Sequence, residues 1–298
     1  MRNGLSGRSR RAVVRRGGAV GLGALALLVG GAPGALSAAP ALQMRPSQGL
    51  GPAPKAKRPQ PPPPAGSPCW ASSNWSGYAL STTTPRGLSC VPASGQTYTS
   101  VSGTWTVPAV QGSGTANTYS AVWTGIDGFT NSSLIQAGTE QDFTGGSAHY
   151  YAWWEILPAA ETVISSIAVQ PGDSISVSIA KQTSGQWLIT LTDNATKQSY
   201  SPPLQSYSGP GTSAEWIVEA PTVGSITTLA NYGSTIFDNG STSTGSPGLA
   251  AGTGGEMVQG RGPRQQVVSI PSGPDTGTPA GDGFAAAYGS AAPAAPST

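Results

Sequence analysis

The chain has 298 residues, of which only 9% are charged, and it contains 42 Gly and 27 Pro. Residues 1–68 hold ten of the fifteen Lys and Arg and none of the thirteen Asp and Glu, so the remainder carries five cations and thirteen anions, a net charge of −8. An acidic chain with so few lysines argues against nucleic-acid binding, because contacts to phosphates need clustered cations.

Residues 1–39 have the layout of an export signal: basic residues up to Arg16, an apolar run over 19–29, and small residues at 35–39. The apolar run is too short to span a bilayer comfortably. Paired arginines in SRRAVV, residues 9–14, leave the twin-arginine route open beside the general secretory route. We therefore expect a secreted, extracellular protein that has no membrane association after processing.

Residues 40–68 form a proline-rich segment with four cations, no acid and the run PPPP at 61–64. Such a composition predicts an extended, unpacked chain. Two interpretations remain open. The segment is either a spacer or a removable prosegment that is attracted to the acidic domain that follows it.

The folded domain is expected over residues 69–289, followed by a disordered tail at 290–298. Cys69 and Cys90 are the only cysteines, and in an exported protein they predict one disulfide that closes a loop of about 20 residues. These cysteines and the single His149 are too few for a metal site. No metal and no other cofactor is expected.

Alternation of apolar and polar residues from Thr99 onward predicts antiparallel strands. The run TSVSGTWTVP places Val101, Gly103, Trp105 and Val107 on one face, with Ser and Thr between them. Similar runs predict strands near 119–126, 133–140, 148–156, 163–169, 174–181, 186–193, 214–219, 233–238, 257–270 and 283–288. Without helical periodicity between them, these strands indicate an all-β fold, a β-sandwich of two antiparallel sheets of jelly-roll type.

Polar residues in apolar, strand-like surroundings mark a candidate site. Gln136 follows two aliphatic residues, and Glu155 follows an aromatic run. Glu215 and Glu219 bracket Trp-Ile-Val, and alternation in a strand would put both carboxylates on one face. Burying a carboxylate or an amide costs several kcal/mol unless it is hydrogen-bonded, so these groups are either structurally satisfied or functional. Glu215 is expected at the rim or in a salt bridge.

The side chains available for catalysis limit the reaction mechanisms that this chain could use. A serine or cysteine nucleophile would depend on His149, which has no nucleophile-elbow signature near it, and the disulfide consumes both thiols. Carboxylates and an amide remain. A carboxylate can take a proton from water and return it to a leaving group, and an amide N–H can stabilise an oxyanion.

A series of blocks in a fixed order carries a resemblance to a known family over about residues 74–289. The blocks are NWSGYAL, SVSGTWTVP, WTGIDG, LIQAGTE, YYAWWEILP, PGDSISVSI and AEWIVEAP. The series resembles the glutamic peptidases, or eqolisins, which are secreted acid endopeptidases known first from fungi. The resemblance implies a sandwich related in shape to concanavalin-type lectins, with a catalytic glutamine and glutamate.

The family's motifs place the catalytic pair on Gln136 and on Glu219, the acid that closes the AEWIVE block. By the same resemblance, supporting or substrate-binding positions are Trp123, Asp127, Glu140, Trp153 and Glu155. The implied partners are protein or peptide substrates, and we expect a monomer.

Two other classes of protein stay open at the level of the sequence. A β-sandwich with paired acids could be a retaining glycosidase, whose two carboxylates lie about 5 Å apart. It could also be a carbohydrate-binding module without turnover, which would use its tryptophans as platforms. A glycosidase needs two essential acids, whereas the peptidase needs one acid and one amide, so Gln136 distinguishes the two enzymes.

Overall fold

The computed structural model describes residues 68–112 and 114–297. The export signal expected at 1–39 and all but the last residue of the segment 40–68 lie outside the described residues. Within the described part of the chain, no helix is long and apolar enough to cross a bilayer.

The described chain consists of strands joined by turns, and its one helical element is the short 3₁₀ helix Gly262–Arg264. The strands are β1 Trp70–Ser72, β2 Trp75–Ser81, β3 Ser100–Thr106, β4 Ala121–Ile126, β5 Ile135–Thr144, β6 Ser147–Ile156, β7 Thr162–Ile164, β8 Ser174–Lys181, β9 Trp187–Asp193, β10 Ser199–Tyr200, β11 Ser213–Glu219, β12 Thr222–Val223, β13 Ser225–Ile226, β14 Ser234–Thr242, β15 Gly255–Gln259, β16 Gln266–Pro274 and β17 Phe284–Tyr288. The predicted all-β class is confirmed.

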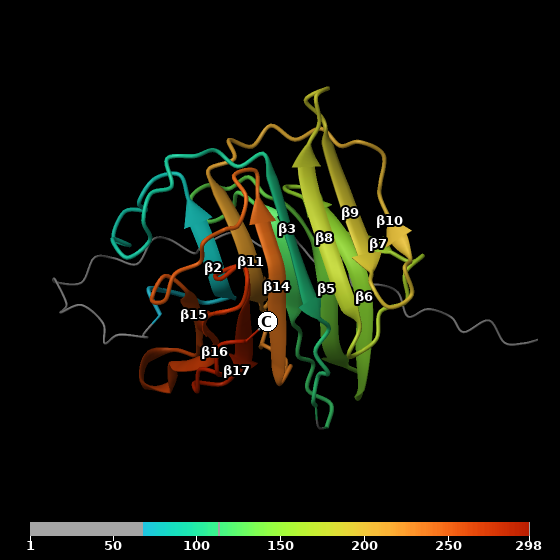
Figure 1. Ribbon diagram of the computed structural model, residues 1–298. Coiled ribbons are helices and arrows are strands. Elements are labelled where there is room, and N and C mark those ends of the chain that lie inside the picture. Colours follow the sequence, from blue (N-terminus) through green and yellow to red (C-terminus); the bar gives the residue numbers. More distant parts are fainter. Residues whose placement is uncertain (1–67, 113, 298) are drawn as a thin grey trace, which may run out of the picture. The chain divides into compact units, whose positions relative to one another are not determined.

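Two layers arise from a single hydrogen-bonded path in the order β10-β9-β8-β3-β14-β17-β16-β15-β2-β11-β4-β5-β6-β7. Neighbours along the path are antiparallel, and β1 joins β15 in parallel. Strand β3 contacts β4 and β11, and β8 contacts β4 and β5, so the path folds back on itself. We call β10, β9, β8, β3 and β14 layer A, and β2, β11, β4, β5, β6 and β7 layer B; Figure 1 shows β8 and β9 in front of β5 and β6. The expected sandwich is confirmed, with its layers joined through β15, β16 and β17.

Some strand predictions differ from the structure. The strand expected at 257–270 is two strands, because positive-φ glycines at 260 and 262 and Pro263 interrupt it. The one expected at 163–169 ends at Ile164. Strand β2 was not predicted, since it is buried on both faces and shows no alternation.

The main core lies between the layers, and two tryptophans cross it in opposite directions. The indole N–H of Trp105 in layer A donates to Thr139 Oγ1 in layer B at 3.0 Å, and that of Trp216 in layer B donates to the Ser102 carbonyl in layer A at 2.8 Å. A Cβ on Gly103 would lie 2.8 Å from the Trp216 ring, so glycine is required there for the ring to fit. These contacts fix the position of one layer relative to the other.

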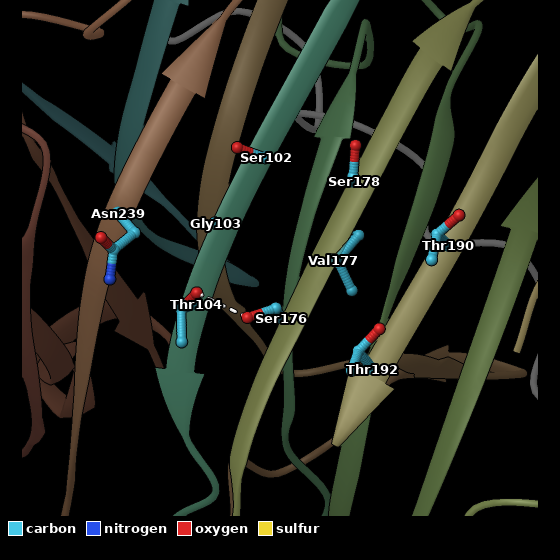
Figure 2. Close-up of a pocket in the computed structure, with 9 residues that line it drawn as sticks. All are labelled: Ser102, Gly103, Thr104, Ser176, Val177, Ser178, Thr190, Thr192 and Asn239. Atoms are coloured by element: carbon cyan, nitrogen blue, oxygen red, sulfur yellow. Dashed lines mark hydrogen bonds between the residues drawn. The ribbon is translucent and has the colours of Figure 1, made fainter. Parts of the chain in front are cut away.

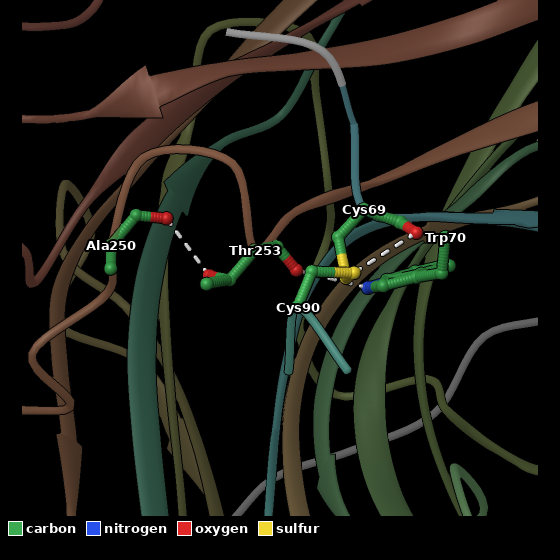
Figure 3. The surroundings of a disulfide bond; sticks show 5 residues. All are labelled: Cys69, Trp70, Cys90, Ala250 and Thr253. Carbon is green, nitrogen blue, oxygen red and sulfur yellow. Dashed lines mark hydrogen bonds between the residues drawn. A yellow bond between two sulfur atoms is a disulfide. The ribbon is translucent and has the colours of Figure 1, made fainter. Parts of the chain in front are cut away.

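A second, smaller apolar cluster covers the opposite face of layer B, where the chain enters the domain. Cys69 and Cys90 form the predicted disulfide, with their Cα atoms 5.7 Å apart (Figure 3). The adjacent Trp70 donates its indole N–H to the Thr253 carbonyl at 3.1 Å and packs on Phe129 at 5.4 Å between ring centroids. This cluster also contains Trp75, Trp123 and Trp153.

Candidate active site

The candidate residues lie on the face of layer B that is turned away from the main core. Along β11, Trp216 and Val218 point into the main core, whereas Ile217 belongs to the second cluster. Alternation therefore places Glu215 and Glu219 on the outer face with Ile217, as the sequence predicted. Both carboxylates are nevertheless buried.

Strand register sets how these side chains align across layer B. Glu219 lies opposite Trp75 in β2 and opposite Ala121 in β4. Gln136 lies opposite Glu155 in β6 and opposite Gly125 in β4. The predicted pair thus sits on β11 and β5, with β4 between them.

Trp123, the central residue of β4 on this face, connects the two members of the pair. Its indole N–H donates to Glu219 Oε2 at 2.9 Å. At the other end of the ring, a Cβ placed on Gly125 would lie 3.1 Å from both Trp123 Cζ3 and Gln136 Cβ. A Cβ on Gly138 in β5 would lie 2.5 Å from Trp123 Cβ. Two glycines therefore leave the space that the Trp123 side chain occupies beside Glu219.

Glu219 is 2% exposed and accepts hydrogen bonds on both oxygens. Besides Trp123, Asn74 donates its side-chain N–H to Oε1 at 3.1 Å. Burial, and after it the charge of Glu155, raises the pKa of Glu219 to about 8, while the hydrogen bonds from Trp123 and Asn74 act in the opposite direction. Asn74 was not among the predicted site residues, although its NWSGYAL block signalled its importance.

Gln136 and Glu155 form a buried hydrogen-bonded pair between adjacent strands. Gln136 Nε2 donates to Glu155 Oε2 at 2.6 Å. Burial raises the pKa of Glu155 to about 7, and the hydrogen bond from Gln136 acts in the opposite direction. The hydrogen bond between Gln136 and Glu155 therefore changes in character when Glu155 gains or loses its proton.

Further carboxyls gather beside the Glu219 end of the pair. Glu140 lies opposite Ala121, which separates it from Glu219, and Asp142 follows it on the same face of β5. Burial, followed by the charges of Asp142 and Glu161, raises the pKa of Glu140 well above its ordinary value. Among the described residues, no group of three or more His, Cys, Asp or Glu is arranged to hold a metal ion.

Asp127 lies apart from the pair, just beyond the end of β4, with a positive φ of 71°. Its carboxylate accepts from Tyr207 O–H at 2.7 Å, from the backbone N–H groups of Gly211 and Thr212 at 2.9 and 2.8 Å, and from the Asn131 amide at 2.8 Å. These bonds tie the segment before β11 to the end of β4. Asp127 therefore supports the framework of the site.

The two remaining predicted positions are both buried on the same outer face. Trp153, in β6 opposite Gly138, packs in the second apolar cluster beside Trp123. Glu215, which was expected at the rim or in a salt bridge, is fully buried, so the rim position is wrong. Burial raises the pKa of Glu215 well above its ordinary value, which favours its neutral form.

A groove of about 230 Å³ lies elsewhere, on the outer face of layer A (Figure 2). Hydroxyl side chains line it, among them Thr104, Ser176 and Thr192, and Thr104 and Ser176 share a hydrogen bond of 2.8 Å. Its lining contains no ionisable side chain. The groove therefore lacks the acid–base groups that the outer face of layer B brings together.

Comparison with known proteins finds a family and individual relatives to which this chain is similar. The model of the peptidase A4 family matches residues 73–271. Aspergillopepsin-2 from Aspergillus niger is 30% identical over 200 residues, which are 58% of this chain and 65% of that protein. Scytalidopepsin B from Scytalidium lignicola is 31% identical over 129 residues, which are 42% of this chain and 48% of that protein. The chain thus covers less than two thirds of either relative.

The fold has a solved counterpart. A crystal structure of scytalido-glutamic peptidase with a transition state analog inhibitor superposes with a TM-score of 0.55 at 23% identity, covering 72% of this chain and 98% of that one. At this level of identity the likeness concerns the fold, and it agrees with the two-layer β architecture.

Proposed function

The chain belongs to the peptidase A4 family, and on that basis we propose that it is an endopeptidase that hydrolyses peptide bonds by a water attack. Glu219 is the proton-transfer group, and Gln136 donates its N–H to the oxyanion. The observation that carries this assignment is the hydrogen bond from the Trp123 indole to Glu219, on the same outer face of layer B on which Gln136 lies two strands away from Glu219.

Glu219 has the environment that proton transfer requires. In its ionised form it takes a proton from the attacking water, and in its protonated form it returns that proton to the leaving amine. A pKa near neutrality lets one carboxyl serve in both directions, and burial raises the pKa of Glu219 to about 8 while Glu155 is charged. Protonation of Glu155 removes that repulsion, so Glu219 then stays ionised to lower pH.

Gln136 contributes a positioned donor. An amide N–H carries no net charge, so it can stabilise the oxyanion of the tetrahedral intermediate over the whole pH range in which the amide keeps its orientation. Its hydrogen bond to Glu155 limits that orientation. The crystallised relative that binds a transition state analog inhibitor supports the same reaction class for this chain.

Proteins or peptides are the proposed substrates. The export signal and the acidic domain support a secreted enzyme that works outside the cell at acid pH. We further propose that it acts as a monomer.

The deciding assay is hydrolysis of an unfolded protein at acid pH by the purified domain, with a chelator and an inhibitor of paired-aspartate proteases present. Cleavage under these conditions is expected, because neither a metal nor an aspartate pair takes part in the proposed mechanism. The same preparation is incubated with polysaccharides, which tests the glycosidase and carbohydrate-binding alternatives. Hydrolysis or binding of polysaccharide with no protein cleavage would overturn the peptidase assignment.

A further inference from the structure

We propose that Glu155 is a positioning residue whose proton controls the oxyanion donor: neutral Glu155 supports Gln136 as a donor, and ionised Glu155 opposes it. This inference rests on the proposed function. Its basis is the buried cross-strand contact in which Gln136 Nε2 lies 2.6 Å from Glu155 Oε2.

The two protonation states of Glu155 act differently on the amide. An ionised carboxylate can only accept, so it holds one N–H of Gln136 and places a negative charge one hydrogen bond away from the developing oxyanion. A neutral carboxyl carries no charge and adds an O–H donor, which can polarise the amide and strengthen its remaining N–H. Because Glu155 is only 4% exposed, water screens this difference weakly.

The groups that face Glu155 reinforce the effect. Glu219 on β11 and Glu161, just before β7, both experience the charge of Glu155, and each of them is a carboxyl whose pKa this charge raises. Within its own hairpin Glu155 faces Gln136, which cannot titrate. Ionisation of Glu155 therefore works against a charged Glu219 as well as against the oxyanion.

Burial and hydrogen bonding act in opposite directions on the two carboxyls. Glu219 receives N–H groups from Trp123 and Asn74, whereas Glu155 receives the amide of Gln136. The donors favour an ionised Glu219, but burial and the charge of Glu155 raise its pKa to about 8, above the value of about 7 for Glu155. Because the charge of Glu155 is one cause of the higher value, a neutral Glu155 lowers the pKa of Glu219, and the productive state has a neutral Glu155 and an ionised Glu219.

The pH profile of kcat/KM tests this inference with Glu155→Gln. The substituted side chain is neutral at every pH and keeps an amide beside Gln136. In the parent enzyme, kcat/KM should fall about tenfold per pH unit above the pKa of Glu155, near 7. In the variant this alkaline limb should move up by at least one pH unit. Glu161→Gln is the matched control, since it removes a neighbouring half-buried carboxyl that accepts a hydrogen bond from Tyr151, and the alkaline limb of this variant should stay within a few tenths of a unit of the parent's.

Glu155→Asp supplies the second measurement if Glu155→Gln does not fold. It keeps a titratable carboxyl but withdraws it from Gln136 by one methylene. Glu155→Asp should lower kcat by about 10- to 100-fold and leave KM nearly unchanged. This effect does not exceed the loss of about 10²- to 10³-fold in kcat that follows removal of a whole oxyanion donor. An alkaline limb that is the same in the parent and in Glu155→Gln, or a Glu155→Asp enzyme with parental kcat, would overturn the role of Glu155. The proposed function would still stand if the parent cleaves protein and Glu219→Gln does not.

Discussion

At the scale of single residues, the outer face of layer B places several carboxyls in unequal surroundings. Glu219 and Glu215 come from one strand, share one face and are both buried. Glu219 accepts well-formed hydrogen bonds from Trp123 and Asn74, whereas no hydrogen bond of good geometry reaches either oxygen of Glu215 among the described residues, and the nearby donors of Ser213 and Phe129 only partly offset the effect of burial on its pKa. Burial without donors favours the neutral acid, whereas burial with donors permits an ionised one.

This difference leads to a paired prediction. Glu219→Gln should reduce kcat at least about 10²-fold, and up to about 10⁴-fold, because the amide keeps the shape and loses the proton transfer. Glu215→Gln is the matched control, and it should keep near-parental kcat because its carboxyl is already favoured in the neutral form. Hydrolysis of an unfolded protein at acid pH measures both variants, with circular dichroism to confirm their fold. A folded Glu219→Gln enzyme that cleaves at the parental rate would refute the mechanism.

At the scale of strands, the site depends on close contact between β4 and β5. The two strands can approach at Trp123 because Gly138 has no side chain, and a Cβ there would come within 2.5 Å of Trp123 Cβ and would also meet the Val122 carbonyl. The register of β4 with β5 places Trp123 opposite Gly138, and the register of β4 with β11 brings its indole to Glu219.

We expect Gly138→Ala to lower the free energy of unfolding by about 1–3 kcal/mol, because overpacking forces neighbouring atoms to move. The displaced indole should also lower kcat/KM. Gly273→Ala in β16 is the control, since a Cβ there would meet no atom within 4 Å. Thermal unfolding and peptide hydrolysis are compared for both variants. Equal stability and activity in the two would show that the β4–β5 contact is not limiting.

At the scale of the whole molecule, several buried or half-buried carboxyls have pKa values above their ordinary range. Burial is the largest cause in each case, and it raises the pKa of Asp142 and Glu155 to about 7 and that of Glu161 and Glu219 to about 8. A group whose pKa is higher in the folded state contributes stability below its unfolded pKa, and this contribution is lost as pH rises through the folded value.

The fold should therefore be most stable in acid and lose stability between about pH 4.5 and pH 8. The net charge of −8 over residues 69–298 acts in the same direction, because repulsion grows as the carboxyls ionise. Melting temperatures measured from pH 3 to pH 8 check this expectation. A melting temperature that rises steadily over that interval would contradict it.

The charge division along the chain carries a second prediction at this scale. Residues 40–68, with four cations and no acid, should bind the acidic domain and inhibit it until acid protonates the carboxyls. A protein beginning at Pro40 should then be less active than one beginning at Cys69, with the difference shrinking at low pH and at high salt. Equal activity under all of these conditions would identify the segment as a spacer.

The amino-acid sequence by itself determined the all-β class, most of the strands after Thr99, the disulfide and the family, because alternation and ordered motifs are local signals. It also placed Glu215 and Glu219 on one face, since that follows from the two-residue period of a strand. The identity of Gln136 and Glu219 as a candidate pair came from motifs alone.

Only the tertiary structure decided how these residues meet. The order and register of the strands in layer B place Trp123 on β4, between the strands of Gln136 and Glu219, and bring Asn74 to the Glu219 carboxylate. Strand β2, buried on both faces, and Glu215, buried instead of exposed at the rim, were misread for the same reason. Burial and pKa depend on what other strands place nearby, and contacts between residues 96 or 145 positions apart leave no periodic signal in the chain.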